Sequence, residues 1–212
     1  DVAAAGVVHT IAGWFAFGVL LNLGPRIGKY NEDGTANEIE GHSLVSSFIG
    51  LLMLIVGFFG FLGACLIWAG ADLGGWVNIY GAPATLSSFA FNTLMGLAGG
   101  MIGAFWWSKG NPFWMMSGGL AGIFICAGGL DIWYPGFAFV LGIIAGCVII
   151  PANNWLHNTF KIDDCVGAVS IHGVAGVLGV LAVGVFAAGY PSAGDIPPTS
   201  FVGQLIGCIV MV

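Results

Sequence analysis

Two histidines stand in matching contexts within apolar stretches of this chain. His9 lies eight residues after Asp1, and His172 lies eight residues after Asp164. A glycine follows each histidine four residues later, at Gly13 and Gly176. An ionisable residue inside an apolar helix is costly, so its presence indicates a function. Imidazole can donate, accept and share protons near neutral pH, so the pair indicates proton-handling chemistry.

Composition places these histidines in a membrane protein. Of the 212 residues, 58% are hydrophobic and only 7% are charged, and the mean hydropathy is +0.98. Soluble domains carry about 25% charged residues, and disordered chains have low hydrophobicity. The net charge of −6 argues against a nucleic-acid partner. The five cysteines lack paired spacing, and the sequence has no phosphate-binding loop or nucleophile motif. We therefore expect no metal site, no disulfide framework, no cofactor and no enzymatic activity.

The hydrophobic runs predict one membrane domain, residues 1–212, with six full spans and the start of a seventh. Lipid-exposed runs of this length form helices, which satisfy their own backbone hydrogen bonds, so we expect an all-α, polytopic membrane helix bundle. The chain starts with Asp and ends within an apolar run too short to cross about 30 Å of hydrocarbon, so it is expected to be a fragment, incomplete at both ends. The expected spans are Val2–Leu23, Ser43–Gly70, Ala84–Ser108, Pro112–Leu130, Pro135–Leu156, Asp164–Gly189 and a run from Pro198 onward.

The basic residues fall in alternate loops. They follow the first, third and fifth spans, at Arg26, Lys29, Lys109 and Lys161. The positive-inside rule places these loops in the cytoplasm. We therefore expect an integral, multi-pass protein of the cell (inner) membrane, with the Asp1 end of the first span outside.

This topology places the two matching motifs on antiparallel helices, five spans apart, as an inverted-topology repeat does. Eight residues of helix rise about 12 Å. Each histidine therefore lies about 12 Å below its own aspartate, and the two aspartates start from opposite faces of a core roughly 30 Å thick. The two imidazoles are expected at nearly the same depth, within reach of each other.

Structural explanations compete with functional ones at these positions. The two histidines can be unrelated, hydrogen-bonded core residues. Each aspartate precedes a helix, where it can cap free N–H groups and complement the helix dipole. Asp164, Gly13 and Gly176 are expected to be structural. His42 and His157 are expected to be solvated loop residues.

Six short motifs occur in order along the chain. They are Asp1-Val2-Ala3-Ala4-Ala5-Gly6-Val7-Val8-His9, Leu23-Gly24-Pro25-Arg26-x-Gly28, Phe59-Gly60-Phe61, Gly119-Leu120-Ala121-Gly122, Ile162-Asp163-Asp164 and His172-Gly173-Val174-x-Gly176. Together they resemble the signatures of the ammonium transporter (Amt/Mep/Rh) family, over essentially the whole chain.

The resemblance implies the fifth to tenth helices, and the beginning of the eleventh, of an eleven-helix fold that forms a homotrimer with one pore per subunit. By position, His9 and His172 match the twin histidines of the transport pore. Asp1 matches the acid near the outer mouth that supports ammonium recruitment. Phe61 matches one ring of the phenylalanine gate, and Cys65 stands where the family has a pore-mouth serine.

The chain departs from the family pattern at four of these positions. Ala4 and Ala5 replace two glycines of the first signature, and Leu62 and Cys65 replace an asparagine and the pore-mouth serine. A thiol is a weaker hydrogen-bond acceptor than a hydroxyl. These changes bear on the efficiency of transport and leave both histidines in place.

The implied function is translocation of ammonium or ammonia across the lipid bilayer. Paired imidazoles can take the proton of ammonium, whereas K⁺ has no proton to give and is excluded from a dry constriction. One alternative is an ammonium-sensing membrane domain, fused to a kinase or cyclase, with little or no transport. Another is a haem ligated by the two histidines. A cytoplasmic regulatory protein is also expected as a binding partner.

Overall fold

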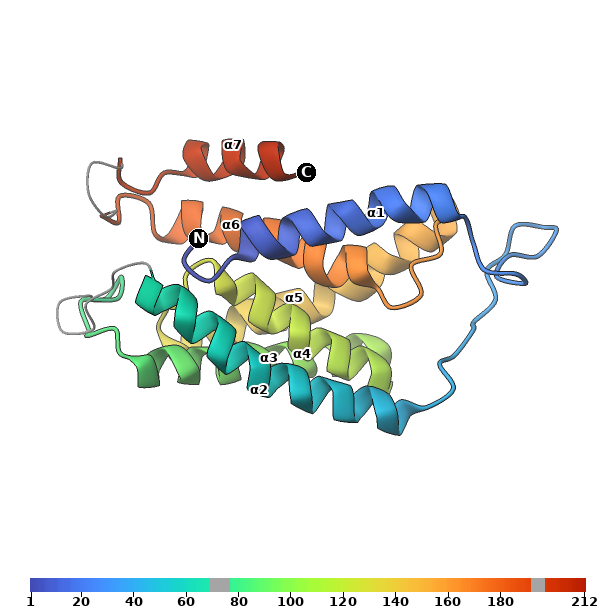
Figure 1. Ribbon diagram of the computed structural model, residues 1–212, viewed down its shortest axis with the longest axis horizontal. Helices are drawn as coiled ribbons and strands as arrows, with labels where there is room; N and C mark the ends of the chain where they lie inside the picture. Colours follow the sequence, from blue (N-terminus) through green and yellow to red (C-terminus); the bar gives the residue numbers. More distant parts are fainter. Residues whose placement is uncertain (69–76, 192–196) are drawn as a thin grey trace.

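The computed structural model describes residues 1–68, 77–191 and 197–212, and the regular elements of these ranges are all helical (Figure 1). Three short segments, marked η, have the wider π-helical winding. In chain order the elements are η1 (Ala5–Thr10), α1 (Ile11–Leu23), α2 (Leu44–Trp68), α3 (Leu86–Ser108), α4 (Pro112–Ala127), α5 (Pro135–Trp155), η2 (Leu156–Phe160), η3 (Val169–Val174), α6 (Ala175–Phe186) and α7 (Phe201–Met211).

A helix lies within each range that was expected to be a span, which confirms the all-α membrane fold. The helix α4 is shorter than expected, with 16 residues, because a buried turn at 128–133 replaces its last part. Gly70, where the second span was expected to end, lies outside the described residues. Within the described residues, five stretches are long and apolar enough to cross a membrane: Ala5–Leu23, Leu44–Cys65, Leu86–Ser108, Pro135–Phe160 and Val169–Phe186.

Glycines bring α3 into close contact with both α4 and α5. A Cβ atom on Gly122 of α4 or on Gly142 of α5 would overlap the carbonyl oxygen of Gly96 on α3. A Cβ on Gly146 would likewise overlap the carbonyl of Gly100. Backbones at this distance tolerate no side chain, and small residues are how helices approach closely in membranes. The high glycine content therefore builds the tight centre of the bundle.

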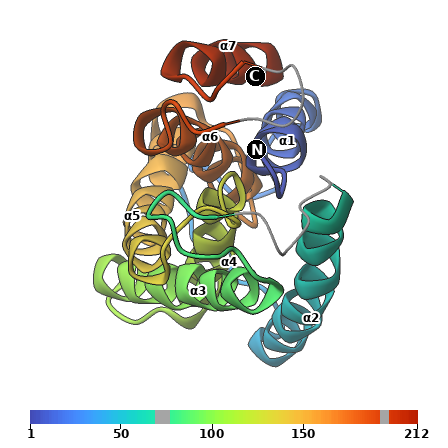
Figure 2. The same cartoon turned by 90° about the vertical axis from the view of Figure 1, so that its left-hand side faces the viewer.

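The helices η1–α1 and η3–α6 run antiparallel and cross near their beginnings (Figure 1). The segment η3 packs on α1, and η1 packs on α6, so each helix contacts the start of the other. This is the geometry that the inverted repeat predicts. Viewed along the long axis, α2 lies at the edge of the bundle beside α3 and α4, and α7 lies outside α6 (Figure 2).

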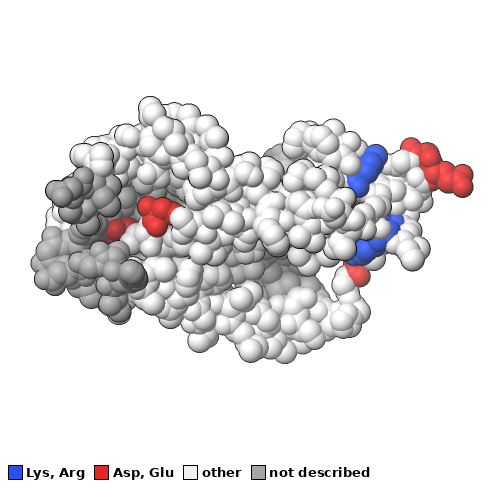
Figure 3. All heavy atoms as spheres, turned by 45° about the horizontal axis from the view of Figure 1, so that its top comes forward, with Lys and Arg blue, Asp and Glu red and all other residues white. Residues whose placement is uncertain are grey.

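The two ends of the molecule differ in charge. The loops that follow α1, α3 and η2 lie at one end, and basic atoms gather there together with acidic ones (Figure 3). Acidic atoms also lie in a hollow toward the other end in this view (Figure 3). The loops that carry the basic residues therefore share one end of the molecule, as the positive-inside rule requires. The orientation of that end across the membrane stays a prediction.

An ion pair fastens the loop after α1 to the segment that leads into η3. The backbone N–H of Arg26 donates to Asp163 Oδ2 at 3.0 Å, and its guanidinium donates to both carboxylate oxygens at 2.7 and 2.8 Å. These hydrogen bonds lower the pKa of Asp163 to about 2. The contact therefore joins the end of α1 to the beginning of η3, the two elements that pack together at the histidines.

This ion pair predicts an acid-sensitive part of the stability. Because the pKa of Asp163 is lower in the folded protein than its ordinary value of 3.8, its contribution is present above that value and is lost as the pH falls toward about 2. The Arg26 side chain is 38% exposed, so solvent screening limits the contribution to about 1 kcal/mol. We expect Asp163→Asn to melt at a lower temperature than the wild type at pH 7 in detergent. The difference should shrink toward zero near pH 2, and a difference independent of pH would contradict this account.

Candidate functional site

The two histidines meet at the crossing of the repeat helices. His9 Nδ1 lies 3.2 Å from His172 Nδ1, and the ring centroids are 5.4 Å apart. His9 is 2% exposed, and its Nε2 has no hydrogen-bond partner among the described residues. The prediction that the two imidazoles touch is confirmed. These two residues are called the histidine pair below.

Both members of the pair lie in π-helical segments, which the sequence did not predict. His9 belongs to η1 and His172 to η3. A π-helical turn holds one extra residue and rotates the side chains that follow, and such turns are frequent at functional sites. In η1 the Thr10 hydroxyl donates to the carbonyl of Ala5 at 3.1 Å, which supports the wider turn. In both copies the widening includes the histidine, with bounds that differ by one residue.

The duplicated aspartates cap these segments. Gly6 N–H donates to Asp1 Oδ2 at 3.1 Å, and Val7 N–H donates to the same oxygen at 3.1 Å. In the second copy, the N–H groups of residues 168 and 169 donate to the two carboxylate oxygens of Asp164 at 2.8 and 2.7 Å. The capping explanation is therefore confirmed for both residues. Any role of Asp1 in ammonium recruitment stays a prediction.

The backbone before each capped segment has the same unusual conformation. Ala4 has a φ of 70° and Gly167, its counterpart in the second copy, a φ of 74°. This left-handed region favours glycine and is strained for alanine. Ala4 is one of the positions where the chain departs from the family's glycines. The N–H groups of Val2 and Ala3 donate to the carbonyls of residues 128 and 127 at the end of α4, which holds this strained stretch in place.

The two matching glycines lie where the helices cross. A Cβ atom on Gly13 would overlap the backbone nitrogen and Cα of Gly173. A Cβ on Gly176 would lie 2.5 Å from the carbonyl oxygen of Ala5 and 2.7 Å from Thr10 Oγ1. Each glycine therefore faces the segment that carries the other copy's histidine. This placement explains why the distance from histidine to glycine is the same in both copies.

The cap at Asp164 carries a testable prediction. Asp164→Ala leaves one buried and one partly buried N–H group without partners, and we expect it to lower the free energy of unfolding by about 1–2 kcal/mol. Asp33→Ala is the matched control, because that carboxylate also accepts from a backbone N–H, but in the exposed loop after α1. Thermal unfolding in detergent compares the two. Equal melting temperatures for both variants would contradict the structural importance of the cap.

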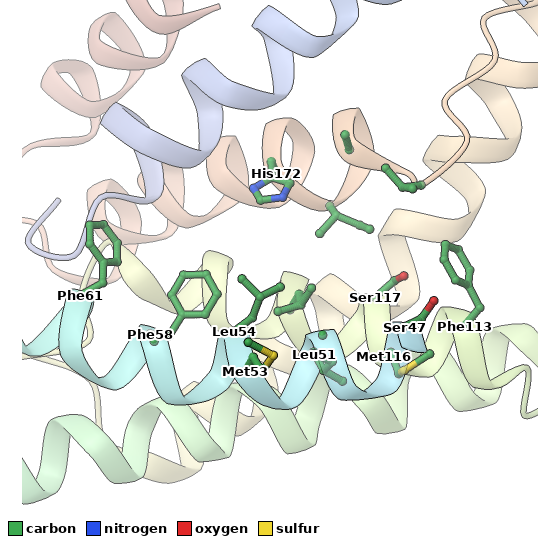
Figure 4. Close-up of a pocket in the computed structure, with 16 residues that line it drawn as sticks. Ser47, Leu51, Met53, Leu54, Phe58, Phe61, Phe113, Met116, Ser117 and His172 are labelled. Atoms are coloured by element: carbon green, nitrogen blue, oxygen red, sulfur yellow. The ribbon is translucent and has the colours of Figure 1, made fainter. Parts of the chain in front are cut away.

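A cavity of about 780 Å³ leads to the pair between α2, α4 and η3 (Figure 4). Its wall is mainly apolar, and His172 lies opposite α2, with Phe58 and Phe61 toward one end and Ser47 and Phe113 toward the other (Figure 4). The cavity reaches His172 but is not lined by His9. A small uncharged molecule could occupy such a space, whereas an ion would lose its hydration there.

The remaining predicted residues lie on α2. The Phe61 ring is 38% exposed, lines the cavity and lies 6.3 Å from the Phe58 ring. Cys65 is partly buried and packs against the hydrophobic core one turn later. Leu62, which stands in place of the family's asparagine, is fully buried. Phe61 thus belongs to the cavity, and the gate and recruitment roles of Phe61 and Cys65 stay predictions.

His157 is placed differently from what we expected. It belongs to η2 rather than to a solvated loop. The backbone N–H of Asp164 donates to His157 Nε2 at 3.1 Å, so the imidazole supports the cap of η3 from outside. The sequence signal that could have found it is the seven-residue separation between His157 and Asp164. His42 is exposed, as expected.

The described residues contain no group of three or more histidine, cysteine or acidic side chains that could hold a metal ion. A haem held between the two rings would need them on opposite sides of a porphyrin. The 3.2 Å contact between the two Nδ1 atoms does not fit that alternative.

The Ammonium Transporter Family model matches residues 1–212. The chain belongs to the ammonium transporter family. Ammonium transporter Amt1 of Haloferax mediterranei is 34% identical over 216 aligned residues, which cover 98% of this chain and 40% of that protein. Amt1 of Methanocaldococcus jannaschii is 31% identical, covering 100% of this chain and 50% of that protein. The chain thus spans about half the length of the curated relatives it matches.

Solved structures of the ammonium transporter family have the same fold. A protein described as a sensor Amt protein superposes with a TM-score of 0.83 at 32% identity, covering 100% of this chain and 51% of that one. Mep2 of Candida albicans superposes with a TM-score of 0.77 at 21% identity, covering 47% of its chain. The family, the helical membrane fold and the partial length are therefore established.

Proposed function

We propose that this chain carries the proton-transfer centre and half of the conduction path of an ammonium transporter. The single observation that carries the proposal is the direct Nδ1–Nδ1 contact of the histidine pair beside an apolar cavity, which His172 lines. In such a contact one ring donates from Nδ1 and the other accepts there. The donating ring then has an unprotonated Nε2, and the accepting ring carries its proton on Nε2.

This arrangement can separate a proton from ammonia. Ammonium that reaches the pair gives its proton to the free Nε2 of one ring and leaves as ammonia through the apolar cavity. The proton between the two Nδ1 atoms then moves to the second ring, which releases its own Nε2 proton on the far side. K⁺ cannot start this sequence, and the apolar wall gives it no replacement for its hydration shell.

The deciding experiment measures current in liposomes that contain the full-length protein. We expect an inward current on addition of ammonium and none on addition of K⁺ at the same concentration. Absence of an ammonium current from correctly inserted protein would overturn the transport proposal. Equal currents with both ions would overturn the proton-transfer mechanism.

A second candidate function is ammonium sensing. It is favoured by the 32% identity to a protein described as a sensor Amt protein and by Cys65 in place of a serine at the expected recruitment position. The same liposomes separate the two functions, because a sensor binds ammonium without an ammonium-driven current. A kinase or cyclase module in the full-length sequence would add support for sensing.

The assembly and orientation belong to the same proposal. The four basic residues lie in loops that alternate along the fold, which supports a cytoplasmic position for that end and an outer position for the Asp1 end of η1. We propose that the full-length protein forms a homotrimer in the cell (inner) membrane and has a cytoplasmic regulatory protein as a partner. Accessibility labelling of a single cysteine introduced at Lys109 tests the orientation.

A further inference from the structure

One aromatic ring contacts both members of the histidine pair, although no sequence motif pointed to it. The Phe124 ring on α4 lies 3.8 Å from the His9 ring, centroid to centroid, with an angle of 21° between the planes. It lies 4.5 Å from the His172 ring, with an angle of 28°. Both contacts are offset stacks of nearly parallel rings rather than edge contacts.

The two imidazoles lie side by side on the same face of this phenyl ring. Their centroids are only 5.4 Å apart, which is too close for rings stacked on opposite faces of Phe124. The phenyl ring therefore forms a flat floor beneath the pair. The Nδ1–Nδ1 contact of 3.2 Å is made above this floor.

Phe124 has little freedom to move. It is 1% exposed, and the Phe58 ring packs edge-on against it at 5.4 Å. Along α4 the cavity is lined as far as Leu120, one turn before Phe124, and Phe124 itself does not line it. Phe124 thus packs against both imidazoles without lining the cavity.

We propose that Phe124 is the positioning residue of the histidine pair. An imidazole can rotate broadly about its outer side-chain torsion, which has no sharply preferred angle. A flat ring in contact with both imidazoles removes that freedom and keeps the two Nδ1 atoms facing each other. The same buried ring covers the face of the pair that it contacts, so that no water reaches the shared proton across that face. The transport consequence of this proposal rests on the proposed function, whereas its geometric part does not.

The test compares variants of the full-length protein. Phe124→Leu keeps most of the apolar volume but removes the flat face, and Phe124→Tyr keeps the face. Phe137→Leu is the matched control. Phe137 lies on α5, and its ring packs against the rings of Trp133 and Phe186 rather than against the histidine pair. Should Phe124→Leu fail to fold, Phe124→Met removes the same face with a more adaptable side chain.

The first readout is solid-state NMR of protein with ¹⁵N-labelled histidine. It detects the coupling between a protonated and an unprotonated Nδ1 that share one hydrogen. We expect this coupling in the wild type, in Phe124→Tyr and in Phe137→Leu, and its loss in Phe124→Leu. A coupling that persists in Phe124→Leu, or is absent from the wild type, overturns the proposal.

The second readout is the ammonium current in liposomes. We expect Phe124→Leu to lower it by at least about tenfold, since a small misplacement of reacting groups costs that much or more. Phe124→Tyr and Phe137→Leu should stay close to the wild type. A wild type that shows the coupling without current disproves transport alone, and the NMR comparison still decides the role of Phe124. A current that Phe124→Leu leaves unchanged overturns its role in transport.

Discussion

Glutamate in place of His172 is expected to remove most of the discrimination between ammonium and K⁺. In the wild type, a K⁺ ion that reaches the cavity meets the His172 imidazole and mainly apolar side chains, which offer it no counter-charge. A carboxylate at that position attracts any cation, and at a few ångströms the attraction in a poorly solvated site amounts to several kcal/mol. We expect the ratio of ammonium to K⁺ current in liposomes to fall by at least about tenfold.

Two further variants make this prediction specific. His9→Asp should act in the same direction, because His9 Nδ1 lies 3.2 Å from His172 Nδ1 in the same pair. His42→Glu is the control, since this exposed histidine lies in the loop before α2. The control should leave the current ratio unchanged. Unchanged selectivity in both pair variants would refute the proton-transfer mechanism.

A single methyl group at Gly13 is expected to have the largest effect on stability. The Cβ of Gly13→Ala would overlap the backbone of Gly173, so α1 and η3 must move apart at the point where the pair is held. Overpacking of this kind costs about 1–3 kcal/mol and occasionally more. We expect a lower melting temperature in detergent and a weaker NMR coupling between the two Nδ1 atoms.

Gly18→Ala is the matched control for this substitution. Gly18 lies on the same helix, and a Cβ there would meet nothing within 4 Å. Alanine is the better helix former by about 1 kcal/mol, so this variant should be as stable as the wild type or more so. Opposite signs for the two substitutions would show that the crossing, and not glycine content as such, sets the effect. Equal effects would contradict the role given to the crossing.

The spans, the antiparallel repeat and the meeting of the histidines could be predicted from the sequence for physical reasons. Lipid leaves the backbone no partner other than itself, so hydropathy locates the helices directly. The spacing of eight residues is the same in both copies, so the two histidines stay matched although the expected α-helical rise does not apply. Residues 1–4 and 164–167 are not helical, and the segments that follow them are π-helical. The contact between His9 and His172 tests that reasoning at the level of individual atoms.

Other features of the site depend on neighbours that are remote in sequence. Nothing in residues 1–10 indicates that η1 is π-helical, because that winding depends on its packing against α6. His157 looks like a loop residue until η2 brings it to the backbone of Asp164. The end of α4 at Ala127 was also missed, because the turn that follows is as apolar and buried as a helix.

The sequence by itself determined that the chain is a bundle of membrane helices. It also determined that two histidines, each preceded by a capping aspartate and followed by a glycine, approach each other on antiparallel helices. Hydropathy, charge placement and helix rise are local or additive properties, so they can be read along the chain. Only the tertiary structure decided which face each imidazole presents and what lies beneath it. The rotation of α4 about its axis selects Phe124 as the ring under both, and that rotation is set by the fit of α4 against α3, through glycines such as Gly96 and Gly122.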